Sequence, residues 1–303
     1  MRDASAAASG PGPGLATALT ALLCLIWGST WLVVREGLED LPPFTAAAAR
    51  FAIAAIVMVF VAHWLVRREG GERPPFWLSL VQGTCNFAIS YGVVYWVEQV
   101  LPSALTSILW GIFPLMMAGC AHVGLPGERL RPIHFVGFAL GFVGLVLLCA
   151  TDVRALGPEA VTASLVLLIS PAVVAVATTL IKRYGENVSS LLLNRNGLIV
   201  GASQLTLLAV LTERDETLSW SGHALFCVGY LAIAGTVVTF SIYFWLLRHA
   251  PAYKLSVIPY VTPAVAVVFG WALADEPMGP TTFIGMGLIL SGVLFVTRPA
   301  ARA

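Results

Sequence analysis

Charged residues are scarce in this chain. Of its 303 residues only 11% are Asp, Glu, Lys or Arg, whereas a soluble protein usually carries about 25%. Hydrophobic residues make up 58%, and the mean hydropathy is +0.86. So little charge cannot cover a chain of this length in water, which excludes a soluble enzyme or binding domain. The net charge of +1 gives no reason to expect a nucleic-acid partner.

Cysteine pairs and clusters of metal ligands are also missing from the sequence. No two of the five cysteines form a CxxC pair, and an odd number leaves no complete set of disulfides. The five histidines are scattered without the spacing of metal ligands. The hydrophobic segments contain no paired acids and no His–Ser pair. We therefore expect no metal, no cofactor and no catalytic residues.

The sequence consists mainly of long hydrophobic runs. A membrane-spanning helix needs roughly 20 mostly apolar residues, and ten such runs follow a Pro/Gly-rich start, residues 1–14, which we expect to be disordered. The runs are too long for barrel strands, so the sequence predicts an all-α polytopic membrane protein with ten transmembrane helices. No loop has room for the soluble domain of a receptor. The predicted helices are 15–34, 44–66, 76–97, 103–123, 132–150, 161–181, 191–211, 222–247, 253–274 and 281–297.

Basic residues favour one side of the membrane. With the N-terminus in the cytoplasm, most Lys and Arg residues fall in inner segments, as the positive-inside rule requires. Ten crossings bring the C-terminus to the same side. We expect a multi-pass protein of the cell inner membrane with both termini in the cytoplasm. The outer loops would contain only Arg35, Arg154 and Arg214.

The two halves of the chain resemble each other. Residues 92–147 read as a diverged copy of residues 241–295. Because each half has five predicted helices, the second half must enter the membrane upside down. The sequence predicts two inverted five-helix repeats, 15–150 and 151–297, before a tail of residues 298–303, with the substrate site between the halves. Matched positions are Trp96 and Trp245, Pro102 and Pro251, Ser107 and Ser256, Pro114 and Pro263, and Glu128 and Glu276.

Short motifs at fixed places give the chain a family resemblance. The first predicted helix contains the string Trp-Gly-Ser-Thr-Trp from Trp27 to Trp31, and the second contains Ala-Arg-Phe around Arg50. In each half a proline is followed by a glutamate and then by a glycine-rich helix. With this order and duplication, the chain resembles the EamA family of the drug/metabolite transporter superfamily over nearly its whole length.

The resemblance implies a transporter with a central cavity formed mainly by the first, third and fourth helices of each half. It implies export of small organic metabolites, such as amino acids or related amphipathic solutes, by alternating access between the two inverted repeats. A nucleoside or nucleotide-sugar carrier of the same superfamily is the alternative. The partners would be a small-molecule substrate and the lipid bilayer. Glycines 137, 141, 144, 285 and 292 predict close helix contacts, either within one chain or in a homodimer.

Polar and aromatic side chains in these helices are the candidate substrate site. Gln82, Asn86 and Ser90 recur every fourth residue and form a polar stripe on the third helix. A polar group facing lipid would have no partner, so the stripe should face a wet cavity or neighbouring helices. A mid-helix proline frees a backbone carbonyl that could bind a solute. The candidate set is Trp27, Gln82, Asn86, Ser90, Tyr91, Ser107, Trp110, Pro114, Thr239, Tyr243, Ser256, Tyr260 and Pro263.

One charge lies deep in a predicted helix. Arg50 is six residues inside the second helix, and Glu98 ends the third helix on the same outer side. Such charges tend to pair or to mark a pathway. The sequence allows an Arg50–Glu98 pair with a gating or coupling role, in which case loss of the Glu98 charge should destabilise the protein. It also allows Arg50 to extend to the interface. Glu128 and Glu276 are better explained by interactions with helix starts.

The predicted orientation can be tested with single cysteines in a cysteine-free background. Residue 215 would lie outside the cell and residue 70 inside it. Asp215→Cys should therefore react with a membrane-impermeant maleimide in intact cells, and Gly70→Cys should not. Both should react once the cells are permeabilised. Labelling of Gly70→Cys alone in intact cells would reverse the orientation.

Overall fold

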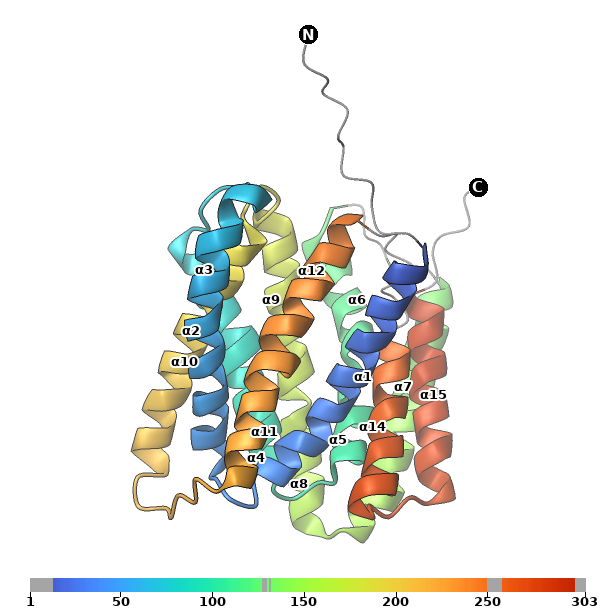
Figure 1. The fold of residues 1–303 in the computed structure, drawn as a ribbon. Coiled ribbons are helices and arrows are strands. Elements are labelled where there is room, and N and C mark those ends of the chain that lie inside the picture. Colours follow the sequence, from blue (N-terminus) through green and yellow to red (C-terminus); the bar gives the residue numbers. More distant parts are fainter. Residues whose placement is uncertain (1–12, 127–129, 131, 250–257, 298–303) are drawn as a thin grey trace.

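The computed structural model describes residues 13–126, 130, 132–249 and 258–297, which form a bundle of helices without a β-strand (Figure 1). The predicted all-α fold is confirmed. By length and composition, six helices of the described part are long and apolar enough to cross a membrane, and two shorter apolar helices lie near the C-terminus. Large apolar side chains cover the outside, as expected for a surface in lipid; examples are Phe60, Trp64, Phe76, Phe142 and Trp271.

The described elements follow the predicted order. The first half contains α1 (Pro13–Gly37), α2 (Pro43–Glu69), α3 (Phe76–Val81), η1 (Gln82–Ile89), α4 (Ser90–Val97), α5 (Ser103–Trp110), α6 (Phe113–Gly124), α7 (Pro132–Leu148) and η2 (Cys149–Val153). The second half contains α8 (Pro158–Leu167), α9 (Ile169–Tyr184), α10 (Ser190–Thr212), α11 (Gly222–Ala232), η3 (Ile233–Val238), α12 (Thr239–His249), α14 (Ile258–Ala274) and α15 (Pro280–Thr297). We call the end of the bundle where α1 begins the N-side and the opposite end the far side. The helix α15 ends at the N-side (Figure 1).

Several of the predicted membrane helices are interrupted. The third passes through the π-helical segment η1 and the eighth through η3, so both halves have a π-helical segment at matching places. The fourth is broken at Gly111 and Ile112, shortly before Pro114, and the sixth at Leu168, shortly before Pro171. Proline removes a helical hydrogen bond, and π-helical segments occur often at functional sites. The interruptions therefore point to the middle of the bundle as the site.

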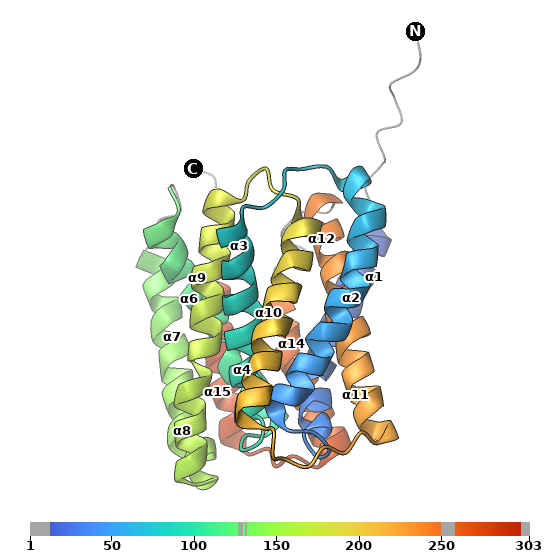
Figure 2. The ribbon, with the colours of Figure 1, turned by 90° about the vertical axis from the view of Figure 1, so that its left-hand side faces the viewer.

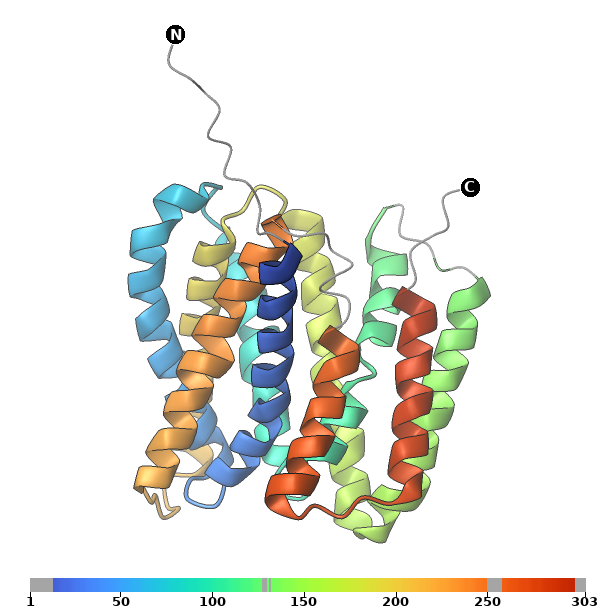
Figure 3. The same ribbon diagram turned by 45° about the vertical axis from the view of Figure 1, so that its right-hand side comes forward.

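Helices of opposite halves pack side by side in matched pairs. The helix α2 packs along α10 (Figure 2), and α7 packs along α15 (Figure 3). The hydrophobic core follows the same arrangement. One large core cluster combines α2, η1, α10 and α11, and the other combines α5, α7, α8 and α15. A smaller cluster joins α1, α12 and α14. Both large clusters therefore contain helices from each half.

Carboxylates at helix ends cap the starts of helices in the other half. Glu69, the last residue of α2, accepts hydrogen bonds from the Leu191 N–H at 3.2 Å and from the hydroxyls of the two preceding serines. In return Glu213, directly after α10, accepts from the N–H groups of Phe44 and Thr45 at 2.8 and 2.7 Å. The first N–H groups of a helix have no partner within it. The pair α2 and α10 is therefore capped reciprocally.

The pair α7 and α15 meets along glycines. A Cβ atom on Gly292 would collide with the carbonyl oxygen of Gly137, and one on Gly144 would lie 2.7 Å from the carbonyl oxygen of Gly285. The backbones approach so closely because these positions have no side chain. The glycine faces thus serve packing within the chain.

Two substitutions on α15 test how tight this contact is. Gly292→Ala would press a methyl group against the α7 backbone and should lower the stability by about 1–3 kcal/mol. Gly287→Ala meets nothing within 4 Å and should be neutral or slightly stabilising, since alanine favours helix. Melting temperatures in detergent test the difference. Equal melting temperatures would show that the glycine contact is not tight.

Candidate functional site

A cavity of about 500 Å³ lies in the middle of the bundle, a volume typical of sites for small molecules. Its lining comes from both halves of the chain and from both large core clusters. On the N-side it extends to Gly185 and Val188, in the loop after α9. Towards the far side its lining on α1 and α4 stops at Val34 and Val94, both buried. The described lining of the cavity therefore reaches the N-side and ends before the far side.

Aromatic rings form much of the cavity wall. Trp27 of α1 lies 5.6 Å from Tyr243 and 5.9 Å from Phe240 between ring centroids. One turn further along α1, the ring of Trp31 lies 6.1 Å from that of Trp110. Rings at these separations pack favourably on one another and offer flat apolar surface to a ligand.

The polar stripe of the third predicted helix faces this cavity. The Asn86 amide donates to the Gln82 side-chain oxygen at 2.5 Å, and both residues line the cavity. Ser90 shares a hydrogen bond of 2.8 Å with Ser170, a residue that the sequence analysis missed. The indole N–H of Trp110 donates to the same Ser170 oxygen at 2.9 Å. Ser170 stands just before Pro171, where the sixth predicted helix breaks, and it fixes α4, α5 and α9 relative to one another.

Arg50 is buried at the cavity, with 1% of its surface exposed. Its Nε donates to the Thr236 hydroxyl in η3 at 3.2 Å, and its guanidinium lies 4.6 Å from the ring centroid of Tyr91 and 5.1 Å from that of Phe51. Such cation–π contacts stabilise a desolvated charge. The predicted pair with Glu98 is wrong for the described residues, and so is extension to the interface. The two rings, Thr236 and the Tyr95 side chain lie around the guanidinium instead, and its charge acts on Glu98 without a hydrogen bond.

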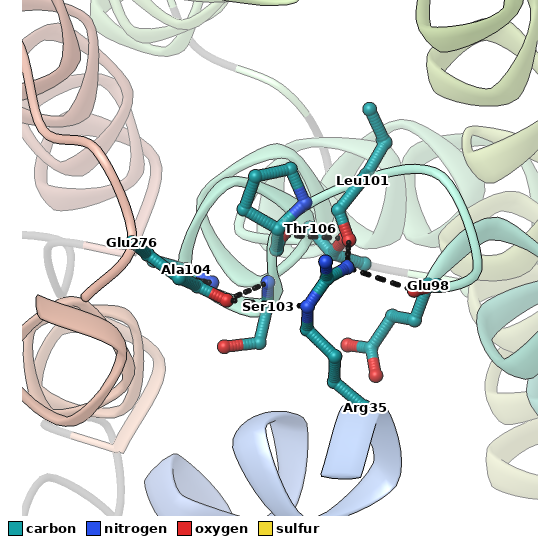
Figure 4. A network of polar contacts seen from close by, with 8 residues as sticks. Arg35, Glu98, Leu101, Ser103, Ala104, Thr106 and Glu276 are labelled. Atoms are coloured by element: carbon teal, nitrogen blue, oxygen red, sulfur yellow. Dashed lines mark hydrogen bonds and ion pairs between the residues drawn. The ribbon is translucent and has the colours of Figure 1, made fainter. Parts of the chain in front are cut away.

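A network around Arg35 closes the far side (Figure 4). The Arg35 Nη1 donates to the carbonyl oxygens of Glu98 at 3.0 Å and of Leu101 at 2.8 Å. Its Nε lies 3.9 Å from a carboxylate oxygen of Glu276. Sequence analysis missed Arg35 because it stands at a helix end, where arginine is ordinary.

Glu276 belongs to the same network. Its carboxylate accepts from the N–H groups of Ser103 at 2.6 Å and Ala104 at 2.9 Å, at the start of α5. This confirms the predicted interaction of Glu276 with a helix start, whereas Glu128 lies outside the described residues. The loop after α14, the start of α5 and the end of α1 are therefore held together.

Glu98 lies in the loop between α4 and α5. Arg35 donates to its backbone carbonyl, and no dashed line joins its carboxylate to the Arg35 guanidinium (Figure 4). The residue is 1% exposed, and neither carboxylate oxygen has a hydrogen-bond partner among the described residues. Burial, followed by the negative charge of Glu276, raises the pKa of Glu98 well above its usual value, against the opposing effect of Arg35 and Arg50. Folding therefore shifts the protonation equilibrium of Glu98 towards the neutral acid.

The structure brings most of the candidate residues to one place. Thr239 is not at the cavity, because its hydroxyl faces the Thr236 carbonyl at 3.4 Å, and Glu98 is also outside the lining. Ser256 and the side chain of Tyr260 lie outside the described residues. A role in substrate binding stays a prediction for all of them. Candidates that line the cavity are Trp27, Arg50, Gln82, Asn86, Ser90, Tyr91, Ser107, Trp110, Pro114, Tyr243 and Pro263.

Some lining residues were not predicted. Phe87, Phe113 and Phe240 read as lipid-facing or core residues in an apolar sequence. Asn194 and Thr262 are single polar residues without a stripe. Only the packing of the helices shows that they face the same space.

The fold and the central cavity define a polytopic membrane transporter. The chain belongs to the EamA-like transporter family, whose family model matches residues 14–150 and 161–298. It is 28% identical to the uncharacterized inner membrane transporter YedA of Escherichia coli (strain K12), over 91% of this chain and 88% of that protein. It is 23% identical to the uncharacterized transporter YoaV of Bacillus subtilis (strain 168), over 92% and 95%. A solved crystal structure, 22% identical, has the same fold with a TM-score of 0.66, covering 94% of this chain and 97% of that one.

The unpaired Glu98 generates a prediction on stability. An acid whose pKa rises on folding binds more protons in the folded state, so stability is lost as the pH rises above the ordinary value of 4.5. Glutamine cannot ionise. Glu98→Gln should therefore melt at a higher temperature than the parent protein at neutral pH, and the difference should shrink as the pH falls towards 4.5.

Glu216→Gln, in an exposed loop, is the matched control and should not alter the melting temperature at any pH. If Arg50 and Glu98 formed a stabilising pair, Glu98→Gln would lower the melting temperature. The expected rise is the opposite result. A lower melting temperature at every pH would show that the Glu98 carboxylate has a stabilising partner.

Proposed function

We propose that this transporter exports small organic metabolites, such as amino acids or related amphipathic solutes, across the cell inner membrane. The observation that carries the proposal is the one-sided cavity, lined by aromatic and small polar groups. If the N-side is cytoplasmic, as the basic residues favour, a solute enters the cavity from the cytoplasm. The far side, closed by the Arg35 network, is the exit.

Alternating access requires two bodies that move relative to each other around the cavity. In this proposal the bodies are the two large core clusters, and each contains helices of both inverted repeats. Release on the far side needs the contacts of Arg35 with Leu101 and Glu276 to break. Glu98 and Arg50 are the proposed gating or coupling residues, because both are buried ionisable groups, and Glu98 interacts with Arg35 and Glu276 of this closure.

An efflux assay tests the function. Cells that express the chain are loaded with labelled amino acids, other amphipathic solutes and nucleosides, and loss of each label is compared with cells that contain an empty vector. Efflux of amino acids or amphipathic solutes supports the proposal. Efflux of nucleosides alone supports the alternative carrier, and efflux of no solute together with accelerated uptake would reverse the direction.

Substitution of a cavity tryptophan generates a prediction on transport. Trp110→Ala removes an aromatic wall of the cavity and should reduce efflux of the best substrate by about tenfold or more. Trp271→Ala is the matched control, because Trp271 lies on the outside of α14 with 64% exposed. Asn86→Ala and Tyr260→Ala should also reduce efflux at unchanged expression. Normal efflux in all three cavity variants would move the site elsewhere.

A further inference from the structure

We infer that Arg50 is the anchor for a carboxylate of the substrate, which defines the substrate class as small amphipathic carboxylates, α-amino acids included. The inference rests on the proposed function and deepens it. It starts from the charge of the cavity. Among the described residues that line it, Arg50 is the sole charged side chain, and no Asp, Glu, Lys or His is present. An anionic group complements this cavity, and a cationic solute without an anionic group is repelled by it.

The surroundings of Arg50 leave part of its guanidinium without a partner. Thr236 accepts from Nε, and the rings of Phe51 and Tyr91 pack near the guanidinium. The Nη1 atom is buried and has no hydrogen-bond partner among the described residues. An unpaired buried charge is costly unless a counter-charge reaches it. The Arg50 charge acts on Glu98, but Glu98 forms no hydrogen bond with it and lies outside the cavity lining. A carboxylate bound in the cavity therefore supplies the direct partner that the described residues do not.

Other side chains at the cavity indicate which further groups a substrate would carry. The side-chain oxygens of Asn86 and Thr262 are buried without a hydrogen-bond partner, and both residues line the same cavity as Arg50. Rotation of either side chain on binding would turn its buried oxygen towards a donor such as an ammonium or hydroxyl group. The rings of Trp27 and Trp31 offer surface for an apolar body.

A carboxylate fits the cavity better than a phosphate monoester does. One guanidinium neutralises one negative charge, and a carboxylate brings one into the low-dielectric interior. A phosphate monoester carries nearly two charges at pH 7, and the described lining has no second cation for the excess. Arginine can bind a carboxylate or a phosphate through paired donors. An experiment must therefore show which of the two groups the cavity prefers.

Five probes with one phenyl body test the anchor on the purified full-length protein. They are 3-phenylpropionate, L-phenylalanine, L-phenylalaninamide, phenethylamine and phenylphosphate, and the readout is the ligand-induced rise in melting temperature. The two carboxylates should stabilise the protein, and the amide and the amine should not. Stabilisation by phenylphosphate beyond that by the carboxylates would replace carboxylate with phosphate as the anchored group.

Variants of Arg50 then assign the effect to this residue. Arg50→Gln should weaken binding of both carboxylates about ten- to hundredfold, the loss expected for one charged hydrogen-bonded contact. Arg50→Lys should restore part of it, because the charge returns without the paired donors. Arg154→Gln, an exposed arginine, is the control and should bind as the parent does. If Arg50→Gln does not fold, the preference of the parent protein among the five probes still shows whether the cavity binds a carboxylate.

Two results would overturn the inference. One is equal stabilisation by phenethylamine and 3-phenylpropionate, and the other is no stabilisation by either carboxylate. Neither would disprove transport, because the efflux panel measures that separately. A chain that exports amines but no carboxylates would remain a transporter and lose the proposed anchor.

Discussion

The unsatisfied N–H groups at helix starts are the constraint on which this fold depends. A helix start cannot remain unpaired where water is excluded. Here carboxylates from the opposite half supply the partners: Glu69 and Glu213 cap α10 and α2, and Glu276 caps α5. Asp152, in the connection between the halves, accepts instead from the side-chain hydroxyls of Thr281 and Thr282 at the start of α15. These contacts tie the halves together at both ends of the bundle, and one of them, Glu276, also meets Arg35 at the far side.

The hydrophobic core also connects the two halves of the chain. Because α2 pairs with α10 and α7 with α15, each large cluster has its own hydrophobic interior built from both inverted repeats. The cavity lies where the clusters face each other, and there the helices are irregular. The π-helical segment η1 brings Asn86 to the cavity wall. The segment η3 places the buried Thr236 where its hydroxyl accepts a hydrogen bond from Arg50. Irregular backbone at membrane depth is tolerated because it is buried in protein or lines a cavity.

Much of the fold could be predicted because it rests on features that are local in sequence: long apolar runs, duplicated prolines and a polar stripe. The stripe of Gln82, Asn86 and Ser90 does face the cavity. The hydrogen-bonded Arg50–Glu98 pair was not found, because sequence shows the depth of a residue but not its neighbours. The guanidinium lies against two rings, and Thr236 accepts from its Nε. The π-helical segments were missed since a regular helix of 3.6 residues per turn was assumed, and Ser170 since a lone serine carries no pattern.

The helix pair α7 and α15 contributes to packing and not to the described lining of the cavity. No described residue of α7, α8 or α15 lines the cavity, whereas α7 and α15 meet along glycines that leave no room for a Cβ atom. Substitutions of side chains that face the cavity therefore leave the glycine contacts of α7 and α15 in place. The wall of α1, α4 and α5 is correspondingly free to diverge in shape and polarity while these contacts stay fixed. A single scaffold of this kind can diversify into carriers for unrelated solutes by changes at a small number of inward-facing positions.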